Sequence, residues 1–350
     1  MGNDVVVHAR PLKQFVQAVF ERAGFTPAGA EMQADVLLWA NLRGVDSHGV
    51  QRIAWYLELL DKGHMHPRPN IRVVKETPAT VLIDADFSPG PVVTVPAMKQ
   101  AIQKARQVGI GWAIIRNTLH QGAIGYYALM AANEHMAGLA IVCNPPNMAP
   151  YGARAAGVHN SPIAICVPGK RRRPLMLDMA TSVAAQGKLD VAKDKRIPIP
   201  LGWALDQAGK PTTDPHAAAV LLPAGGGKGS GLAMLFECLT SLFAGNPLLA
   251  PVFQGKPNAD AHHQNSVVAA IDISSFTDAE EYGANADAIV EGIKGLPLAD
   301  GFSEVLVPGE LEDRVQTERA RLGIPLPPGT VQKLTTASER FGVPLPWPTA

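Results

Sequence analysis

The sequence predicts an α/β protein whose chain begins with a unit of helices. Over about the first sixty residues the apolar side chains recur every three or four positions, which is the spacing of one helix face. From residue 80 onward, short apolar runs alternate with helical patterns, as in folds that pack helices on a sheet. A chain of 350 residues also exceeds one typical core, so we expect two or three domains.

The composition indicates a globular protein and excludes several classes of partner. Apolar residues make up 47% of the chain, and the 31 basic residues balance the 31 acidic ones, so we expect neither nucleic acid nor an anionic membrane as a partner. The three cysteines include no CxxC pair, so the sequence supports neither a disulfide framework nor a structural zinc site. Because no leader pattern and no membrane-length apolar run occurs, we expect a soluble protein of the cytoplasm.

Three helices are predicted for the N-terminal unit. The first ends at Gly24. Thr26-Pro27 supplies an N-cap and a first-turn proline for the second helix, which runs toward Gly44. The third is expected to begin in the polar stretch that follows, to bury one face of residues 50–60 and to end at Gly63.

Strands and helices then alternate to the C-terminus. Strands are expected at residues 80–84, 112–116, 139–142, 163–167, 175–179, 267–273 and 304–307. Helices are expected at residues 98–105, 124–136, 183–191, 232–243, 278–293, 311–322 and 331–341. The fourth and fifth strands predict a hairpin with a basic tip, Lys170-Arg171-Arg172-Arg173, which either contacts a phosphate or is a solvated turn.

Residues 43–52 concentrate polar chemistry between two predicted helices. If Asp46 or Ser47 caps the following helix, its first backbone N–H groups favour an anion. His48 and Arg52 stand four residues apart and would share a helical face. A substrate carboxylate on Arg52 would then lie near an imidazole whose pKa we expect at its ordinary value of roughly 6.5. The stretch predicts proton transfer on a small acid, and the alternative is a structural cap with a surface arginine and a buried histidine.

Three further places carry candidate chemistry. His120 lies between a strand end and a helix start, a common position for ligand contacts, although a loop histidine without a role fits equally. Asp178 ends a strand just before Thr181-Ser182, which can cap the next helix. Lys228 lies in a glycine-rich loop at a helix start, a setting suited to a phosphate, although the spacing fits neither usual phosphate motif.

Six ordered motifs together resemble one known family. They are Arg43-Gly44-Val45-Asp46-Ser47-His48-Gly49 with Arg52 and Tyr56, His120-Gln121-Gly122-Ala123-Ile124-Gly125-Tyr126, Asn144-Pro145-Pro146, Leu177-Asp178-Met179-Ala180-Thr181-Ser182 with Gly187-Lys188, Pro200-Leu201-Gly202-Trp203-Ala204, and Gly227-Lys228-Gly229. In these motifs the chain resembles the second, non-Rossmann family of malate/L-lactate dehydrogenases. That family also includes ureidoglycolate, sulfolactate and diketogulonate enzymes and cyclic-imine reductases. The resemblance extends to the closing segment Gly323-Ile324-Pro325.

The resemblance implies a particular architecture. NAD or NADP would lie on a mixed, mostly antiparallel sheet, not on a doubly wound parallel one, which explains the missing GxGxxG motif. A helical N-terminal unit at residues 1–69 would pack with C-terminal helices at 311–350. An α/β connecting segment would occupy residues 70–119, and the NAD(P)-binding domain residues 120–310. The resemblance also implies a homodimer.

Roles for single residues are implied in the same way. His48 or His120 would exchange the proton, while Ser47 and Arg52 would hold the substrate carboxylate together with Asn144. Asp178 would orient an imidazole at the nicotinamide side of the cleft. No metal is expected. The cofactor would contact His120, Asn160, Ser161, Asp178, Met179, Ala180, Thr181, Ser182, Lys228, Gly229, Pro308, Gly309 and Glu310.

Two positions depart from the family pattern near the expected pocket. Where the family commonly has Gly-Thr-Asn-Pro, this chain has His159-Asn160-Ser161-Pro162. Gln121 replaces an aromatic residue that many members carry beside the histidine. The identity of the substrate is therefore the part of the resemblance that transfers least.

The expected reaction is hydride transfer between NAD or NADP and a small 2-oxo or 2-hydroxy acid such as malate or lactate. The alternatives are reduction of a cyclic imino acid, Δ1-piperideine-2-carboxylate or Δ1-pyrroline-2-carboxylate, and a catalytically silent cofactor-binding protein. A hydrolase triad of Ser47, His48 and Asp178 is disfavoured, because adjacent side chains at a helix start diverge by about 100°.

Overall fold

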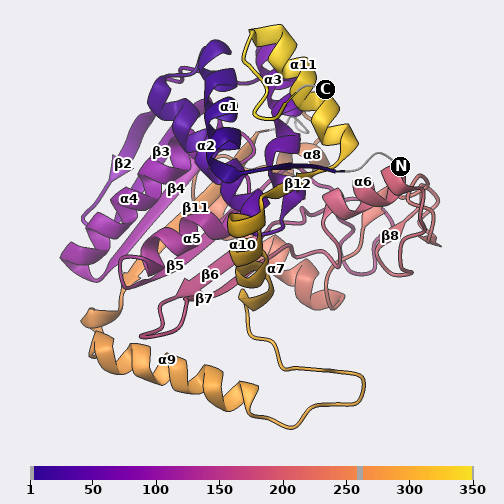
Figure 1. Ribbon diagram of the computed structural model, residues 1–350. Coiled ribbons are helices and arrows are strands. Elements are labelled where there is room, and N and C mark those ends of the chain that lie inside the picture. Colours follow the sequence, from indigo (N-terminus) through magenta and orange to yellow (C-terminus); the bar gives the residue numbers. More distant parts are fainter. Residues whose placement is uncertain (1–3, 258–262, 349–350) are drawn as a thin grey trace.

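A seven-stranded mixed sheet forms the centre of the computed structural model, which describes residues 4–257 and 263–348 (Figure 1). The strand order is β2-β3-β4-β11-β5-β6-β7, in which β3 and β4 run parallel and the other neighbours antiparallel. The expected mixed, mostly antiparallel α/β architecture is thereby confirmed. The strands are β2 (Arg72–Glu76), β3 (Thr80–Ser88), β4 (Ile110–Thr118), β5 (Met136–Cys143), β6 (Ile163–Val167), β7 (Leu175–Met179) and β11 (Gln264–Asp272).

Helices cover both faces of the sheet. Ile115 of β4 is buried in the cluster shared with α4 and α5, whereas the neighbouring Ile114 is buried with Phe236 of α7 on the opposite face. This alternation follows from strand geometry, since successive side chains point to opposite faces. Burial on both faces explains why the central strands are almost continuously apolar in sequence. The covering elements are α4 (Gly90–Val108), α5 (Gly125–Ala132), α7 (Gly227–Glu237) and the π-helical turn Cys238–Leu242.

The N-terminal and C-terminal helices pack together at one end of the sheet (Figure 1). Thr26 caps α2 as expected, because its hydroxyl accepts a hydrogen bond from the Gly29 N–H. Phe20 and Tyr56 share a buried cluster with Leu334 near the C-terminus. The division into residues 1–69 with 311–350, 70–119 and 120–310 stays a prediction. The helices are α1 (Ala9–Arg22), α2 (Pro27–Leu42), α3 (Ile53–Asp61), α10 (Glu310–Leu322) and α11 (Pro328–Phe341).

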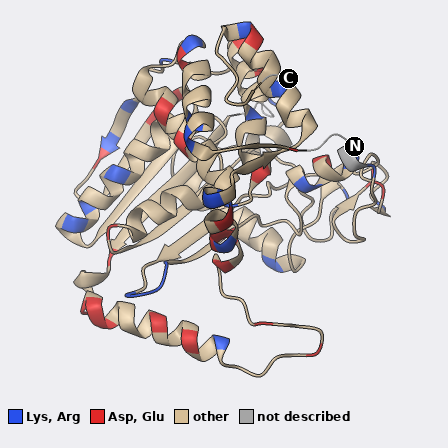
Figure 2. Ribbon diagram, in the orientation of Figure 1, with Lys and Arg blue, Asp and Glu red and all other residues tan. Residues whose placement is uncertain are grey.

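Two further parts flank the sheet. One contains α6 (Gln186–Lys195), α8 (Leu249–Phe253) and a small sheet of β8 (Ala204–Leu205), β9 (Pro211–Thr212) and β10 (Val220–Leu221). The other is α9 (Ala279–Lys294), which a long connection joins to α10 (Figure 1). In Figure 2 the basic tip of the β6–β7 hairpin lies beside acidic residues of α9, with Lys170 paired to Glu280 and Arg172 to Glu291. No helix in the described part of the chain is long and apolar enough to cross a membrane.

One predicted strand is absent, and several observed strands were not predicted. The strand expected at residues 304–307 does not form, and the Val307 N–H is instead bonded to the Glu310 carboxylate in the turn before α10. The sequence also failed to predict β2, the pair of β1 (Val5–Val7) with β12 (Ile324–Leu326), and the two-residue strands β8 to β10. All five residues of β2 are exposed, and β1 has only three residues, so neither shows a legible apolar alternation.

Two helix predictions also need correction. The helix expected at residues 124–136 ends at Ala132, because Met136 already belongs to β5. Thr181-Ser182 does not cap α6, whose cap residue is Ala185 without a side-chain bond. The Ser182 hydroxyl donates to the Ala184 carbonyl instead, so the chain makes a local turn before the helix begins.

Candidate active site

The two histidines that the sequence offers as alternatives lie against each other. The rings of His48 and His120 are stacked, with centroids 5.3 Å apart and planes inclined by 27°. His48 comes from the 3₁₀ turn Asp46–His48, and His120 from the loop after β4. Segments more than seventy residues apart therefore contribute to one site.

Each ring is anchored through its Nδ1 atom. The Tyr56 hydroxyl lies 2.6 Å from Nδ1 of His120, and the Gly122 N–H donates to the same atom at 3.4 Å. Two donors at Nδ1 make it an acceptor and leave the ring proton on Nε2. The hydroxyl of Ser47 lies 2.9 Å from Nδ1 of His48. Among the described residues, nothing hydrogen-bonds to Nε2 of either ring, so this atom of each ring is free to exchange a proton.

Both imidazoles are neutral at physiological pH. Burial, together with the positive charge of Arg52, lowers the pKa of His48 to about 4. Burial, followed by the charges of Arg52 and His48, lowers the pKa of His120 well below its usual range. The expected ordinary value is therefore wrong for the protein without ligand. A neutral imidazole is a base that can accept a proton from a substrate hydroxyl.

Arg52 presents its guanidinium beside the imidazoles. Its Nε donates to the Ser47 carbonyl at 2.6 Å, and its central carbon lies 5.5 Å from the ring centroid of Trp55. In the part of the chain that the structure describes, no carboxylate pairs with it. Such a guanidinium is suited to bind the carboxylate of a small acid.

The start of α6 closes the other side of this site. A Cβ atom added to Gly187 would lie 2.6 Å from the Cβ of Ser47 and 3.9 Å from Nη2 of Arg52. The sequence placed Tyr56 and Gly187 in motifs without a role, and it missed Trp55. Contacts between segments so distant in sequence leave no local pattern from which to find them.

The polar stretch is not the start of a helix, which corrects the capping prediction. Two 3₁₀ turns flank Gly49, whose backbone is extended. The carboxylate of Asp46 is bound by Arg319 and Asn41, and Ser47 makes no capping bond. The Asn41 side chain also accepts the Val50 N–H at 2.8 Å, and it fills the space where a Cβ on residue 49 would lie.

Two expectations fail with the helix. His48 and Arg52 do not share a helical face, because they belong to two separate 3₁₀ turns that flank the extended Gly49, yet the charge of Arg52 still acts on His48. Ser47 and His48 do share a hydrogen bond, so divergence of their side chains was the wrong objection to a hydrolase triad. The triad still lacks its acid, since no hydrogen bond among the described residues joins Asp178 to His48.

Asp178 lies at the end of β7 and binds the start of α5. Its carboxylate accepts a hydrogen bond from the Gly125 N–H at 2.8 Å. Desolvation of the carboxylate by the surrounding protein raises the pKa of Asp178 to about 6. The hydrogen bond from Gly125 and the positive charge of Arg43 both lower this pKa, but desolvation has the larger effect. Direct orientation of an imidazole by Asp178, as expected from the sequence, is not what the structure shows. Next to it, Met179 and Ala180 are partly exposed.

Several expected cofactor residues meet where α7 begins. The Thr181 carbonyl accepts the Ala224 N–H at 2.8 Å, and the Ala224 carbonyl accepts the Gly229 N–H at 2.8 Å. The Thr181 N–H donates to the Asn160 carbonyl at 3.4 Å. The hydroxyl of Thr181 is buried without a partner among the described residues, and Lys228 is exposed in the first turn of α7. An exposed lysine at a helix start is suited to an anionic ligand such as a diphosphate.

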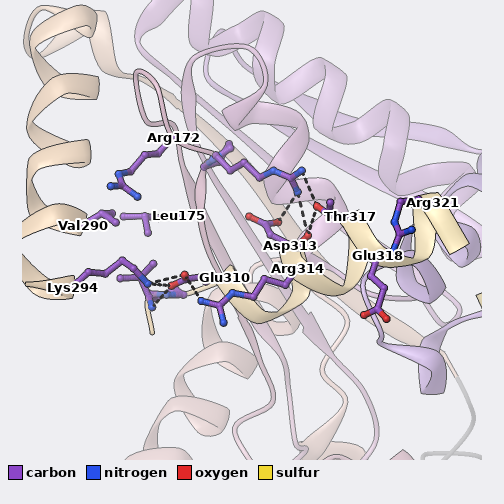
Figure 3. A pocket seen from close by; sticks show the side chains of 14 residues that line it. Arg172, Leu175, Val290, Lys294, Glu310, Asp313, Arg314, Thr317, Glu318 and Arg321 are labelled. Carbon is purple, nitrogen blue, oxygen red and sulfur yellow. Dashed lines mark hydrogen bonds and ion pairs between the residues drawn. The ribbon is translucent and has the colours of Figure 1, made fainter. Parts of the chain in front are cut away.

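A pocket of about 640 Å³ joins the remaining expected cofactor residues to the basic hairpin tip (Figure 3). Pro308 and Glu310 line it together with Arg172 and Arg173. Lys294, assisted by Arg314, lowers the pKa of Glu310 to about 2, so its carboxylate is ionised. The pocket is tied to β7, because the Met176 N–H donates to the Pro308 carbonyl at 3.3 Å, and position 309 lies against Met176.

Some expected ligand residues use their side chains elsewhere. The amide of Asn144 donates to the Pro145 carbonyl at 2.9 Å. Ser161 is fully buried, and its hydroxyl contacts Nδ1 of His159. The Asn160 side chain accepts a hydrogen bond from Asn147 at 2.9 Å. These bonds reduce the contacts that Asn144 and Ser161 can offer a ligand in the observed conformation.

Comparison with known proteins gives concordant results. The family described as malate/L-lactate dehydrogenase matches residues 7–335. The L-sulfolactate dehydrogenase of Methanocaldococcus jannaschii is 39% identical over 310 residues, 88% of this chain and 89% of that protein. A malate dehydrogenase of Pyrococcus horikoshii is 36% identical over 97% of both chains. The crystal structure of Δ1-piperideine-2-carboxylate reductase from Pseudomonas syringae superposes with a TM-score of 0.84 at 26% identity, covering 95% of this chain and 99% of that one.

Proposed function

This chain belongs to the malate/L-lactate dehydrogenase family, and from that premise we propose that it transfers a hydride between a nicotinamide cofactor and C2 of a small 2-oxo or 2-hydroxy acid. Family membership makes it an oxidoreductase acting on hydroxy acids. The choice of cofactor and of acid belongs to the proposal. The cofactor, when bound, supplies or takes the hydride, and the protein supplies orientation and one proton.

The observation that carries this proposal is the guanidinium of Arg52 beside two stacked neutral imidazoles. A 2-hydroxy acid has a carboxylate and a hydroxyl on neighbouring carbons. With the carboxylate on Arg52, the hydroxyl reaches the imidazoles, where a neutral ring takes its proton during oxidation. In the reverse direction the same ring returns the proton to the oxygen.

The contacts of the two rings favour His120 as the acid–base group. Tyr56 and Gly122 fix its Nδ1, so its Nε2 has a defined direction. His48 is held by Ser47, and both lie beside Arg52. We assign His48 and Ser47 to binding of the substrate oxygen atoms, a choice between the two histidines that the sequence left open. The test is a pair of variants, His120→Gln and His48→Gln. Turnover should collapse in His120→Gln while the affinity for the cofactor is kept. A larger loss of turnover in His48→Gln would assign the acid–base role to His48.

The residues present fit a dinucleotide. In the proposed path Asp178 and Thr181 would contact the nicotinamide half, Lys228 with the start of α7 suits the diphosphate, and the pocket at Glu310 suits the adenosine half. The unpartnered hydroxyl of Thr181 supports this path, because a buried polar atom normally has a partner.

NADP is favoured over NAD by the charges at the pocket. Five basic side chains line it, Arg172, Arg173, Lys294, Arg314 and Arg321, against the three acids Glu310, Asp313 and Glu318. The acid Glu310 is already paired with Lys294 and Arg314, so it repels a 2′-phosphate less than a free carboxylate would. Arg172→Ala should weaken NADPH binding and leave NADH binding nearly unchanged, as measured by fluorescence titration. Equal loss for both cofactors would remove the preference.

Turnover with a substrate panel tests the whole proposal. Purified protein is assayed with NADH and NADPH against malate- and lactate-type 2-oxo acids and against cyclic imino acids. Oxidation of a reduced cofactor with a 2-oxo acid is expected. Turnover only with Δ1-piperideine- or Δ1-pyrroline-2-carboxylate would favour the imine reductase, to which the likeness with the Pseudomonas syringae enzyme points. Cofactor binding without any turnover would indicate the catalytically silent protein.

A further inference from the structure

Three metal-ligating side chains meet in the interior, outside the site described above. Cys143 is the last residue of β5, His159 lies in the loop before β6, and Glu237 is the last residue of α7. Their ligand atoms all lie within 4.8 Å of one another, and all three residues are buried. Nε2 of His159 lies 3.4 Å from Oε2 of Glu237. Neither the sequence motifs nor the proposed reaction uses this cluster.

Each of the three side chains also makes a contact outside the cluster. The Ser161 hydroxyl contacts Nδ1 of His159, and the Thr240 hydroxyl lies 2.8 Å from Sγ of Cys143. Oε1 of Glu237 accepts the N–H groups of Leu248 at 2.7 Å and Leu249 at 3.0 Å. Metal sites in proteins show this same arrangement, in which outer contacts fix the direction of each ligand. Sγ of Cys143, which the Thr240 hydroxyl also contacts, Nε2 of His159 and Oε2 of Glu237 are the three atoms that approach one another.

We propose that Cys143, His159 and Glu237 bind a divalent cation, with Zn²⁺ as the best match. Thiolate, imidazole and carboxylate are the ligand types that zinc takes, and the two anionic ligands balance its charge in a buried site. At bond lengths of about 2.0–2.3 Å, tetrahedral donors lie roughly 3.3–3.6 Å apart. The His159–Glu237 separation of 3.4 Å already meets this spacing. Binding forms a metal–sulfur bond and releases the thiol proton.

The cluster depends on residues that distinguish this chain from the common family pattern. His159 and Ser161 stand within the segment where the family commonly has Gly-Thr-Asn-Pro. A glycine at position 159 would leave no imidazole ligand. The metal would join the end of β5, the loop before β6 and the end of α7, and the last two of these elements carry the proposed cofactor residues Asn160 and Lys228. The site would therefore brace the cofactor cleft without touching the substrate.

The rival arrangement is a metal-free ion pair. In the absence of a cation, Cys143 and Glu237 raise the pKa of His159 to about 9, although burial lowers it. A buried imidazolium beside a carboxylate would explain the 3.4 Å contact equally well. The two arrangements differ in what the protein retains on purification and in how it responds to added metal.

Metal content of the full-length protein, purified without a histidine tag and without added metal, is the first measurement. Elemental analysis should find about one zinc per chain. Cys143→Ser and His159→Gln should each lose it. Cys166→Ser is the matched control, because Cys166 is buried on the neighbouring strand β6 outside the cluster, and its zinc content should equal that of the wild type. Zinc retained equally by all four proteins would overturn the assignment.

Cobalt binding provides a second measurement, which uses only the wild-type protein and so does not require that the variants fold. Co²⁺ added to chelator-treated wild-type protein should produce a sulfur-to-cobalt charge-transfer absorption, which only a thiolate ligand gives, and Zn²⁺ should raise the melting temperature. Absence of bound zinc, of the cobalt band and of any shift in melting temperature would show the metal-free pair and sink the proposal. Because none of these readouts uses turnover, their outcome is independent of the proposed reaction.

Discussion

The charge of Arg52 sets the electrostatics of the site at the scale of single residues. It lowers the pKa of both His48 and His120, after burial, and it is the charge that we propose binds the substrate. The same guanidinium thus adds to burial in keeping the imidazoles neutral until an anion arrives. A bound carboxylate would cancel that charge and allow the proton-accepting ring to become positive.

Substitution of Arg52 by alanine should weaken substrate binding selectively. A charge-assisted hydrogen bond contributes about 1.5–3 kcal/mol, so KM should rise by roughly ten- to a hundredfold. The dissociation constant of the cofactor should stay nearly unchanged, because no hydrogen bond or ion pair among the described residues joins Arg52 to the residues proposed for the diphosphate and the adenosine half. Steady-state kinetics and cofactor titration of Arg52→Ala measure the two effects, with Arg52→Lys as the charge-preserving control. Equal loss of both affinities would show a structural role.

The titration of His48 provides the second prediction at this scale. In the protein without ligand its NMR resonances should titrate near the lowered pKa of about 4, and a saturating 2-hydroxy acid should move the midpoint upward. The pKa of His48 in the folded protein lies below its unfolded value of roughly 6.5. The contribution of the neutral ring to the stability of the fold is therefore fully present above a pH of roughly 6.5. That contribution is lost as the pH falls toward 4. A midpoint near 6.5 without ligand would contradict the burial described for this ring.

At the scale of elements, the site is made where short irregular segments meet regular ones. The two 3₁₀ turns around Gly49 carry His48 and Arg52, and the start of α6 closes against them. Asn41 of α2 holds the break between the turns. The approach of α6 to the two 3₁₀ turns therefore determines the shape of the proposed binding site for the substrate carboxylate.

A methyl group on Gly187 should disturb this approach. The added Cβ would lie 2.6 Å from the Cβ of Ser47, so α6 or Ser47 must shift. Gly187→Ala should raise KM several-fold with little change in melting temperature, because alanine favours a helix by up to about 1 kcal/mol. Gly292→Ala in α9 is the matched control, since nothing lies within 4 Å of its added Cβ. An unchanged KM in Gly187→Ala would remove α6 from the substrate site.

At the scale of the whole molecule, several large apolar side chains are exposed on elements that follow one another in the chain. Large apolar side chains are exposed along α7, the π-helical turn and α8, and they include Leu235, Phe243 and Phe253. Phe243 and Phe253 are 62% and 68% exposed. Where such exposed apolar side chains form a contiguous patch, they usually mark an interface between chains. We therefore expect this face to pair with a second copy.

Light scattering coupled to gel filtration tests that expectation. The protein should elute as a dimer, with twice the chain mass of 37.1 kDa. Leu235→Glu with Phe243→Glu should give a monomer, because charges would be buried at the contact. Val73→Glu on the edge strand β2 places a charge at another exposed apolar residue and should leave the dimer intact. A wild-type monomer at micromolar concentration would contradict the dimer.

The sequence by itself determined the fold class, most helices and strands, and the family. These follow from local information, since apolar spacing marks each element and the caps at Thr26 and Gly63 are set by neighbouring residues. It also singled out His48, His120 and Arg52, because imidazole and guanidinium groups are typical of proton transfer and anion binding. It could not find β1, which has only three residues, or β2, whose five residues are all exposed, because neither carries a legible apolar pattern.

Tertiary structure alone decided how these residues are used. It stacked the two imidazoles, lowered their pKa values by burial, and replaced the expected helix start at Asp46 by two turns. It also gathered Cys143, His159 and Glu237, which are far apart in sequence and match no metal-binding spacing. The physical reason is the same in each case. Burial, electrostatic neighbours and ligand geometry depend on which distant segments pack together, and local spacing does not encode that packing.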